Sequence, residues 1–122
     1  MSDPPDRPEA NDFDYVFPFE RHLHAVAPGL HEAQNAWMSQ IDSLRFPDRK
    51  THELIRMVCT VINRNPAGVE RHAQLAAEVG ATWEDIAGSI LLTEPAFGIL
   101  RAIEALPAAR RGFNAAAASE TD

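Results

Sequence analysis

Apolar residues recur every three or four positions along most of this chain, and no segment alternates apolar and polar residues with the period of two that marks a β-strand. Such spacing places apolar side chains on one face of a helix. The clearest stripe in the first half of the chain consists of Leu30, Ala33, Trp37, Ile41 and Leu44. The pattern predicts an all-α fold, a compact bundle of about five to six helices joined by short turns.

The expected helices carry boundary signals. Side chains that can accept a hydrogen bond from the first amides of a helix precede several of them, and Thr82 with Asp85 forms a variant of the capping box. Glycine after a helix and proline beside one mark further boundaries. The expected starts are at Pro28, Asp48, Asn65, Thr82 and Pro95, and the expected ends are at Phe46-Pro47, Gly80 and Pro107.

Length and composition bound the organisation of the chain. Its 122 residues are enough for one domain, which we expect over residues 15–113. Residues 1–14 are acidic and rich in proline, and residues 114–122 are small and polar, so we expect flexible tails at both ends. Hydrophobic types make up 45% of this short chain, which favours a homo-oligomer.

The charge balance excludes some partners. A formal net charge of −7, from 18 acidic and 11 basic residues, repels nucleic acid and anionic membrane surfaces. No apolar run approaches the length of about eighteen residues typical of a membrane span, and the N-terminus lacks the pattern of a signal peptide. We therefore expect a cytoplasmic protein that binds neither nucleic acid nor membrane. An anionic substrate would need a local cluster of arginines.

His72 and Glu53 are the candidate catalytic residues. His72 falls on the apolar stripe of its helix, where a desolvated imidazole can act as a general acid or base. The alternative is a core histidine bonded to a backbone carbonyl or to Glu53. Glu53 lies at the edge of the apolar face of its own helix and could orient an imidazole or act as a base. The alternative is a solvated ion pair on the helix surface with Arg49, four residues before it, or Arg56, three residues after it.

The other reactive side chains give weaker signals. The single cysteine, Cys59, rules out an intrachain disulfide, and its apolar neighbours in mid-helix indicate an inert core thiol. His22, His24 and His31 could gather on one side of a helix, but no metal-binding spacing accompanies them. We therefore expect solvated surface histidines, no metal site and no cofactor.

Three arginines and one tryptophan complete the set of candidates. Arg64, Arg71 and Arg101 could line an anion pocket, although charged residues at such spacing usually lie on a solvated face. Trp83, at the first turn of its helix, is expected to anchor that helix against a neighbouring helix or subunit.

The stretch from Glu53 to His72, ELIRMVCTVINRNPAGVERH, and its flanks DRKTHELI and HAQLAAEVGATWEDI resemble the carboxymuconolactone decarboxylase superfamily, which includes the AhpD-type alkylhydroperoxidases. The redox members carry a glutamate, a Cys-x-x-Cys motif and a histidine four residues after the second cysteine. Glu53 and His72 have the matching separation, but Asn65 and Gly68 stand at the cysteine positions. The resemblance covers roughly residues 28–113 and implies an AhpD-like helical subunit that forms trimers or hexamers.

Three functions are compatible with these residues. The leading hypothesis is non-redox acid/base chemistry, a decarboxylation or a related lyase or isomerase step on a small unsaturated carboxylic acid or lactone, as the resemblance to the decarboxylase branch implies. His72 would be the general acid/base and Glu53 its orienter. The first alternative is alkylhydroperoxidase or peroxiredoxin-type reduction of peroxides, for which one helix-interior thiol lacks a partner. The second is an idle helical oligomer that binds a small acid or a protein partner.

The leading hypothesis also assigns residues to an anionic substrate. Arginines would hold its carboxylates, and the exposed N–H groups at the start of the helix after Asn65 would favour an oxyanion or carboxylate. An ordinary helix cap explains Asn65 and Gly68 equally well. The expected substrate-binding residues are Arg49, Arg56, Asn65, Gly68 and Arg71.

Overall fold

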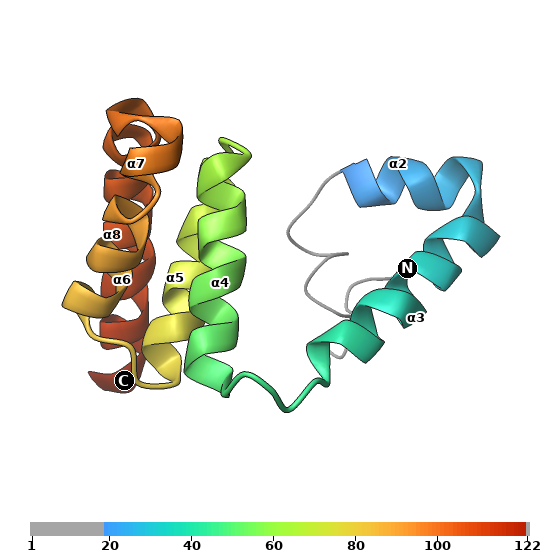
Figure 1. Ribbon diagram of the computed structural model, residues 1–122. Helices are drawn as coiled ribbons and strands as arrows, with labels where there is room; N and C mark the ends of the chain where they lie inside the picture. Colours follow the sequence, from blue (N-terminus) through green and yellow to red (C-terminus); the bar gives the residue numbers. More distant parts are fainter. Residues whose placement is uncertain (1–18, 122) are drawn as a thin grey trace. The chain divides into compact units, whose positions relative to one another are not determined.

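The computed structural model describes residues 19–121, and every regular element within that range is a helix (Figure 1). In chain order the helices are α2 (Phe19–Val26), α3 (Pro28–Asp42), α4 (Arg49–Ile62), α5 (Pro66–Glu78), α6 (Trp83–Leu91), α7 (Glu94–Phe97) and α8 (Ile99–Thr121). The predicted all-α fold class is confirmed.

The chain divides into two compact units, residues 1–44 and 45–122. Within the described residues the first unit contains α2 and α3, and the second contains α4 to α8. The sequence predicts a single domain over residues 15–113, and the structure divides this range between Leu44 and Arg45. The tail expected over residues 1–14 lies outside the described residues. Residues 114–121, where the sequence predicts a second tail, continue α8 to Thr121.

In the second unit α5 packs against both α4 and α8, and α6 packs on α8 (Figure 1). The α8 side of this core is built from alanine, whose small side chain lets helices approach closely. Gly112 marks one such approach, because a Cβ atom there would lie 2.1 Å from the backbone oxygen of Glu70 in α5. The buried hydrophobic residues of this core are Met57, Val61, Val69, Ala73, Ala76, Ala81, Ile86, Ile90, Ala102, Ala105, Ala108 and Ala109.

Trp83 anchors the start of α6 on α8, as the sequence predicts. Its ring lies 5.9 Å from that of Phe113, measured between centroids, and the guanidinium of Arg110 lies 4.6 Å from the centre of the indole. The contact fixes α6 to the long C-terminal helix.

The predicted helix caps of the second unit are confirmed. Asp48 and Asn65 each accept a hydrogen bond from the amide three residues later, at 2.8 Å and 3.1 Å. Thr82 and Asp85 exchange two hydrogen bonds of 3.0 Å in a capping box. Gly80 follows α5 with a φ of +105°, a conformation that glycine adopts without strain. Local sequence therefore sets where α4, α5 and α6 begin.

Two predicted helix ends are wrong. α8 runs through Pro107, although proline lacks the amide hydrogen that the carbonyl of Ile103 would otherwise bind. Alanine residues on both sides of Pro107 are buried, and this packing outweighs the local cost of the proline. α3 ends at Asp42, before the Phe46-Pro47 pair that the sequence predicts as its end.

In the first unit α2 and α3 pack against each other around a buried polar cluster. Oε1 of Glu20 lies 3.2 Å from Nε2 of His31, and its Oε2 accepts a hydrogen bond of 3.0 Å from Gln34. His31 is therefore buried, which corrects its prediction as a surface histidine, whereas His22 and His24 are exposed.

Large apolar side chains remain uncovered in both units. In the stripe predicted on α3, Leu30 is 61% exposed and Trp37 is 63% exposed. At the start of α8, Leu100 is 63% exposed and Ile103 is 57% exposed. None of the helices within residues 19–121 combines the length and the apolar character that crossing a membrane requires.

Candidate functional site

Glu53 of α4 and His72 of α5 are in contact. Nδ1 of His72 lies 3.0 Å from Oε1 of Glu53, within hydrogen-bonding distance. The side chain of Glu53 is 1% exposed and that of His72 is 11% exposed. The packing of α4 on α5 thus brings together two residues that lie 19 positions apart in sequence. This geometry fits a core histidine whose Nδ1 is hydrogen-bonded, and it fits a catalytic carboxylate–histidine pair equally well.

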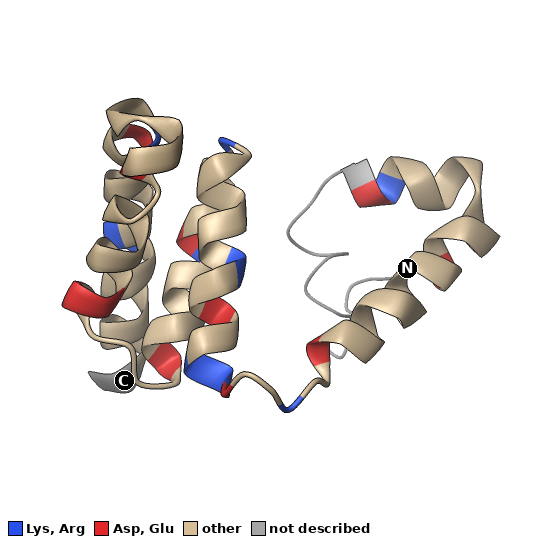
Figure 2. Cartoon of the chain, viewed as in Figure 1, with Lys and Arg blue, Asp and Glu red and all other residues tan. Residues whose placement is uncertain are grey.

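The other carboxylate oxygen of Glu53 faces Arg49. Nη2 of Arg49 lies 2.8 Å from Oε2, and Nη1 of the same guanidinium lies 3.3 Å from Nδ1 of His52. Figure 2 shows basic and acidic positions following one another along α4. The ion pair offered as the alternative role of Glu53 therefore exists. It is not the solvated surface pair that the sequence suggests, because its carboxylate is buried.

Glu53 is held in its ionised form. Burial alone raises the pKa of this carboxyl, but the hydrogen bond and charge of His72 and the charges of Arg49 and Arg56 together lower the pKa below its ordinary value. An ionised carboxylate only accepts hydrogen bonds, so this contact assigns the proton of the neutral imidazole to Nδ1 and the lone pair to Nε2. Nε2 is then the atom that can take a proton from a substrate or return one.

A helix cap and a close contact occupy the positions that hold cysteines in the redox members. Asn65 caps α5 by accepting the amide hydrogen of Gly68, so that amide is not available to a substrate, which corrects this part of the prediction. A Cβ atom at Gly68 would lie 2.7 Å from Cγ2 of Thr60. A thiol at position 68 would therefore require the side chain of Thr60 to move.

Arg56 and Arg71, two further predicted ligands of an anionic substrate, are both partly buried. Arg56 lies close enough to Glu53 to lower the pKa of its carboxyl, and Arg71 precedes His72 on α5. Both side chains are thus carried by the two helices that form the Glu53–His72 pair, and both interact with other groups in the structure.

Cys59 is exposed, so its prediction as an inert core thiol is wrong. It lines an apolar cavity of about 440 Å³ between α4, α6 and α7, together with Val58 and Ile62. The apolar residues around Cys59 suggested burial, but within the described residues of the second unit this face of α4 is not covered, and Ile55 on it is 51% exposed.

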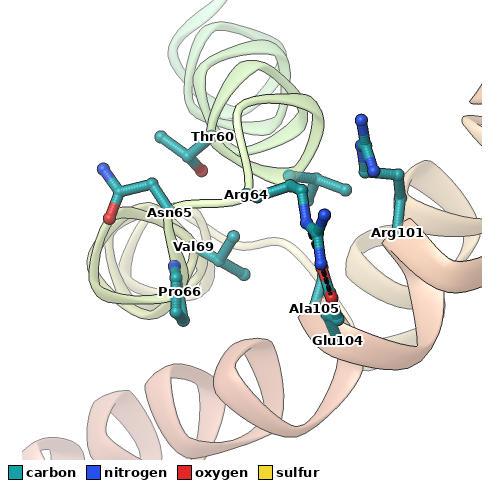
Figure 3. Close-up of a pocket in the computed structure, with 9 residues that line it drawn as sticks. Thr60, Arg64, Asn65, Pro66, Val69, Arg101, Glu104 and Ala105 are labelled. Carbon is teal, nitrogen blue, oxygen red and sulfur yellow. Dashed lines mark hydrogen bonds and ion pairs between the residues drawn. The ribbon is translucent and has the colours of Figure 1, made fainter.

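A second cavity, of about 390 Å³, lies between the C-terminal end of α4, the start of α5 and the first turns of α8 (Figure 3). Arg64 pairs with Glu104 there through two hydrogen bonds, with 2.9 Å between Nε and Oε1. Arg101 donates from Nε to the carbonyl oxygen of Ile62 at 3.1 Å. Two of the three arginines suggested for an anion pocket therefore line one cavity, whereas Arg71 does not line it.

Sequence reasoning missed Glu104. Its partner Arg64 lies 40 positions away, and the only local signal is its place three residues after Arg101 on the same helix. The cavity of Figure 3 is lined by neither Glu53 nor His72, although it includes Val69, one helical turn before His72 on α5.

Among the described residues, the histidines of the first unit do not assemble a metal centre with other ligands. Within residues 19–121, no group of three or more His, Cys, Asp or Glu side chains is placed to hold a metal ion. His24 instead lies edge-on to His31, with 5.1 Å between the ring centroids.

Comparison with known proteins identifies the family of this chain. The model of the carboxymuconolactone decarboxylase family matches residues 32–111, a range that includes Glu53, His72 and the cavity of Figure 3. No curated protein and no solved structure matches the chain significantly. The family match covers well over half of the sequence and agrees with the all-helical fold. The chain belongs to the carboxymuconolactone decarboxylase family.

Proposed function

We propose that the chain carries out acid/base chemistry at His72, a decarboxylation or a related lyase or isomerase step on a small unsaturated carboxylic acid or lactone. The observation that supports this most is the 3.0 Å contact between Nδ1 of His72 and the buried carboxylate of Glu53. The replacement of both redox cysteines by Asn65 and Gly68 supports non-redox chemistry.

In a decarboxylation of this kind, the bond between the carboxylate and a ring carbon breaks, CO₂ leaves, and the bonding electron pair passes into the conjugated carbonyl group. Protonated His72 then transfers a proton from Nε2 to carbon, so that CO₂ is exchanged for a proton. Glu53 fixes the orientation of the ring and stabilises the imidazolium. Water returns the proton to His72.

Cations would place the carboxylates of the substrate. Arg49 contacts Glu53 at 2.8 Å, so in this proposal it holds the carboxylate of the pair rather than the substrate. Arg56 and Arg71, on the same two helices, are the proposed substrate ligands.

The test is CO₂ release from a carboxylated unsaturated lactone by the wild type and by variants. His72→Gln should lower kcat by about 10²- to 10⁴-fold, the usual range for loss of a general acid or base. Glu53→Gln should lower kcat less, because the imidazole remains. His22→Gln, which changes an exposed histidine of α2, is the matched control and should leave the rate unchanged. Unchanged turnover by His72→Gln would overturn the assignment.

Alkylhydroperoxidase-type reduction of peroxides is the second candidate, and the exposure of Cys59 is the observation that favours it. The thiolate would attack the hydroperoxide, release the alcohol and become a sulfenic acid, and two molecules of an added thiol would restore it with loss of water. Peroxide consumption by the wild type and Cys59→Ser separates the two functions. Consumption that requires both Cys59 and added thiol would replace the decarboxylase proposal.

A catalytically inactive helical oligomer that binds a small acid or a protein partner is the third candidate. It is favoured by the low exposure of His72, whose whole residue is 8% exposed in the single chain. The Glu53–His72 pair would then only fix how α4 packs on α5. In that case neither lactone nor peroxide is consumed, and His72→Gln lowers only the free energy of unfolding.

A further inference from the structure

The cavity of Figure 3 has the character of a binding site for a small organic anion. Residues from α4, α5 and α8 enclose about 390 Å³, and Val69 and Ala105 are among those that form its mainly apolar wall. Pockets for small molecules commonly combine such a wall with a few polar groups that fix orientation. Here the charged groups are Arg64, Arg101 and Glu104.

These three side chains leave the cavity with one excess positive charge. Glu104 binds Arg64 through two hydrogen bonds, and the charges of both Arg64 and Arg101 lower the pKa of its carboxyl. Two cations face one carboxylate, and Arg101, which makes no hydrogen bond to that carboxylate, is the one placed to meet a ligand. The chain as a whole carries a formal net charge of −7, so the local excess of positive charge does not follow from composition.

One hydrogen bond holds the guanidinium of Arg101 in place and leaves its other N–H donors available. Its Nε donates to the carbonyl of Ile62 at 3.1 Å, at the end of α4, and this bond restrains the guanidinium. Among residues 19–121 it is the only hydrogen bond that Arg101 makes, which leaves the terminal nitrogens with donors to offer. In Figure 3 the side chain extends from α8 apart from the Arg64–Glu104 pair. A restrained guanidinium with free terminal donors matches a carboxylate, which it binds by two parallel hydrogen bonds.

We propose that this cavity binds one carboxylate of a small, otherwise apolar organic acid, and that Arg101 anchors it. The proposal is independent of the chemistry proposed at His72, because neither Glu53 nor His72 lines this cavity. A second carboxylate inside the cavity would meet Glu104, so monoanions should bind better than dianions.

The test is a titration of the ¹⁵N-labelled full chain with butanoate, followed by amide chemical shifts. The wild type should show saturable shifts at the cavity, and Arg101→Gln should weaken binding at least about tenfold, the scale expected for a charge-assisted hydrogen bond. Arg111→Gln is the matched control, because Arg111 lies on the same helix, is exposed and pairs with Glu70 outside the cavity. Butanamide and butanedioate should both bind more weakly than butanoate.

A second variant protects the test against a loss of stability, because Arg101 also binds a carbonyl at the end of α4. Glu104→Gln removes the carboxylate that neutralises Arg64, and both side chains of this pair are well exposed. Butanoate should then bind more tightly, and the preference over butanedioate should shrink. A poorly folded variant would not produce tighter binding.

Three results would overturn the proposal: no binding of butanoate to the wild type, equal affinity in the wild type and Arg101→Gln, or shifts confined to residues away from the cavity. His72→Gln separates this site from the proposed chemistry. Butanoate binding that survives His72→Gln, in a protein that turns over no lactone, retains the site and removes the chemistry. Lactone turnover by a wild type that binds no butanoate removes the site and retains the chemistry.

Discussion

At the scale of single residues, the carboxylate of Glu53 has a partner at each oxygen, His72 at Oε1 and Arg49 at Oε2. A buried carboxylate without such partners would take up a proton, because burial disfavours its charged form. The two contacts keep it ionised, and an ionised Glu53 is what assigns the imidazole proton to Nδ1. The chemistry proposed for His72 therefore depends on the negative charge of Glu53, the partner of its Nδ1.

The lowered pKa of Glu53 predicts how stability depends on pH. Because the folded-state pKa lies below the ordinary value of 4.5, the unfolded chain gains its proton first as the pH falls. The stabilisation from the ionised carboxylate is fully present above about pH 4.5 and is lost as the pH falls through the folded-state pKa. Glu53→Gln should flatten the acid decline in the free energy of unfolding, measured by urea denaturation at several pH values. Glu32→Gln, at an exposed acid of α3, should not, and identical declines in the wild type and Glu53→Gln would contradict this account.

Helical periodicity predicts that His72 lies on a buried face, and the family resemblance pairs it with Glu53. Neither predicts that the two side chains are in contact, which the structure shows. Cys59 shows the limit of the same reasoning. Apolar neighbours in sequence indicate burial only if another element covers that face, and within the described part of the second unit no element covers the thiol. Glu104 was missed for a related reason, because its pairing with Arg64 depends on how α8 packs beside the end of α4.

At the scale of helices, the starts of α4, α5 and α6 could be predicted, whereas the helix expected from Pro95 to Pro107 is divided into α7 (Glu94–Phe97) and α8, which starts at Ile99. A helix start is set by local chemistry, as the Asp48 and Asn65 caps show. Pro107 also carries a strong local signal, yet α8 continues past it, because buried alanines on both sides of the proline hold the helix in the core. The close approach of α8 to α5 at Gly112 left no signal that could be read without the packed structure.

The approach at Gly112 predicts opposite effects for two glycine-to-alanine changes. Gly112→Ala should lower the free energy of unfolding by about 1–3 kcal/mol, because its Cβ would meet the backbone of Glu70 and force α5 and α8 apart. Gly88→Ala is the matched control, since a Cβ there meets nothing within 4 Å. Alanine also favours a helix over glycine by up to about 1 kcal/mol, so Gly88→Ala should raise stability. Chemical denaturation of both variants checks this, and a neutral Gly112→Ala would show that the helices are not so closely packed.

At the scale of the whole molecule, the described residues leave large apolar side chains exposed on both units, among them Trp37 on α3 and Leu100 on α8. Such exposure is typical of surfaces that meet another subunit. We propose that the chain forms a homo-oligomer, a trimer or a hexamer as the resemblance implies. Light scattering at micromolar concentration should give the mass of such an assembly, and Leu100→Glu should reduce it. A monomeric wild type would contradict the proposal.

The chain divides into two compact units, residues 1–44 and residues 45–122. Length predicts one domain over residues 15–113, and this stays a prediction. The Glu53–His72 pair and the cavity of Figure 3 both lie wholly in the second unit, so the proposed site can be described from α4, α5 and α8 alone.

The central claim is that Glu53 and His72 act as one catalytic unit, and a double-mutant cycle on kcat/KM for CO₂ release tests it most directly. If Glu53 acts only through the imidazole, the double variant Glu53→Gln, His72→Gln should be no slower than His72→Gln alone. Losses that simply multiply, so that Glu53→Gln slows the His72→Gln background as much as it slows the wild type, would show that the two side chains act independently and would contradict the account.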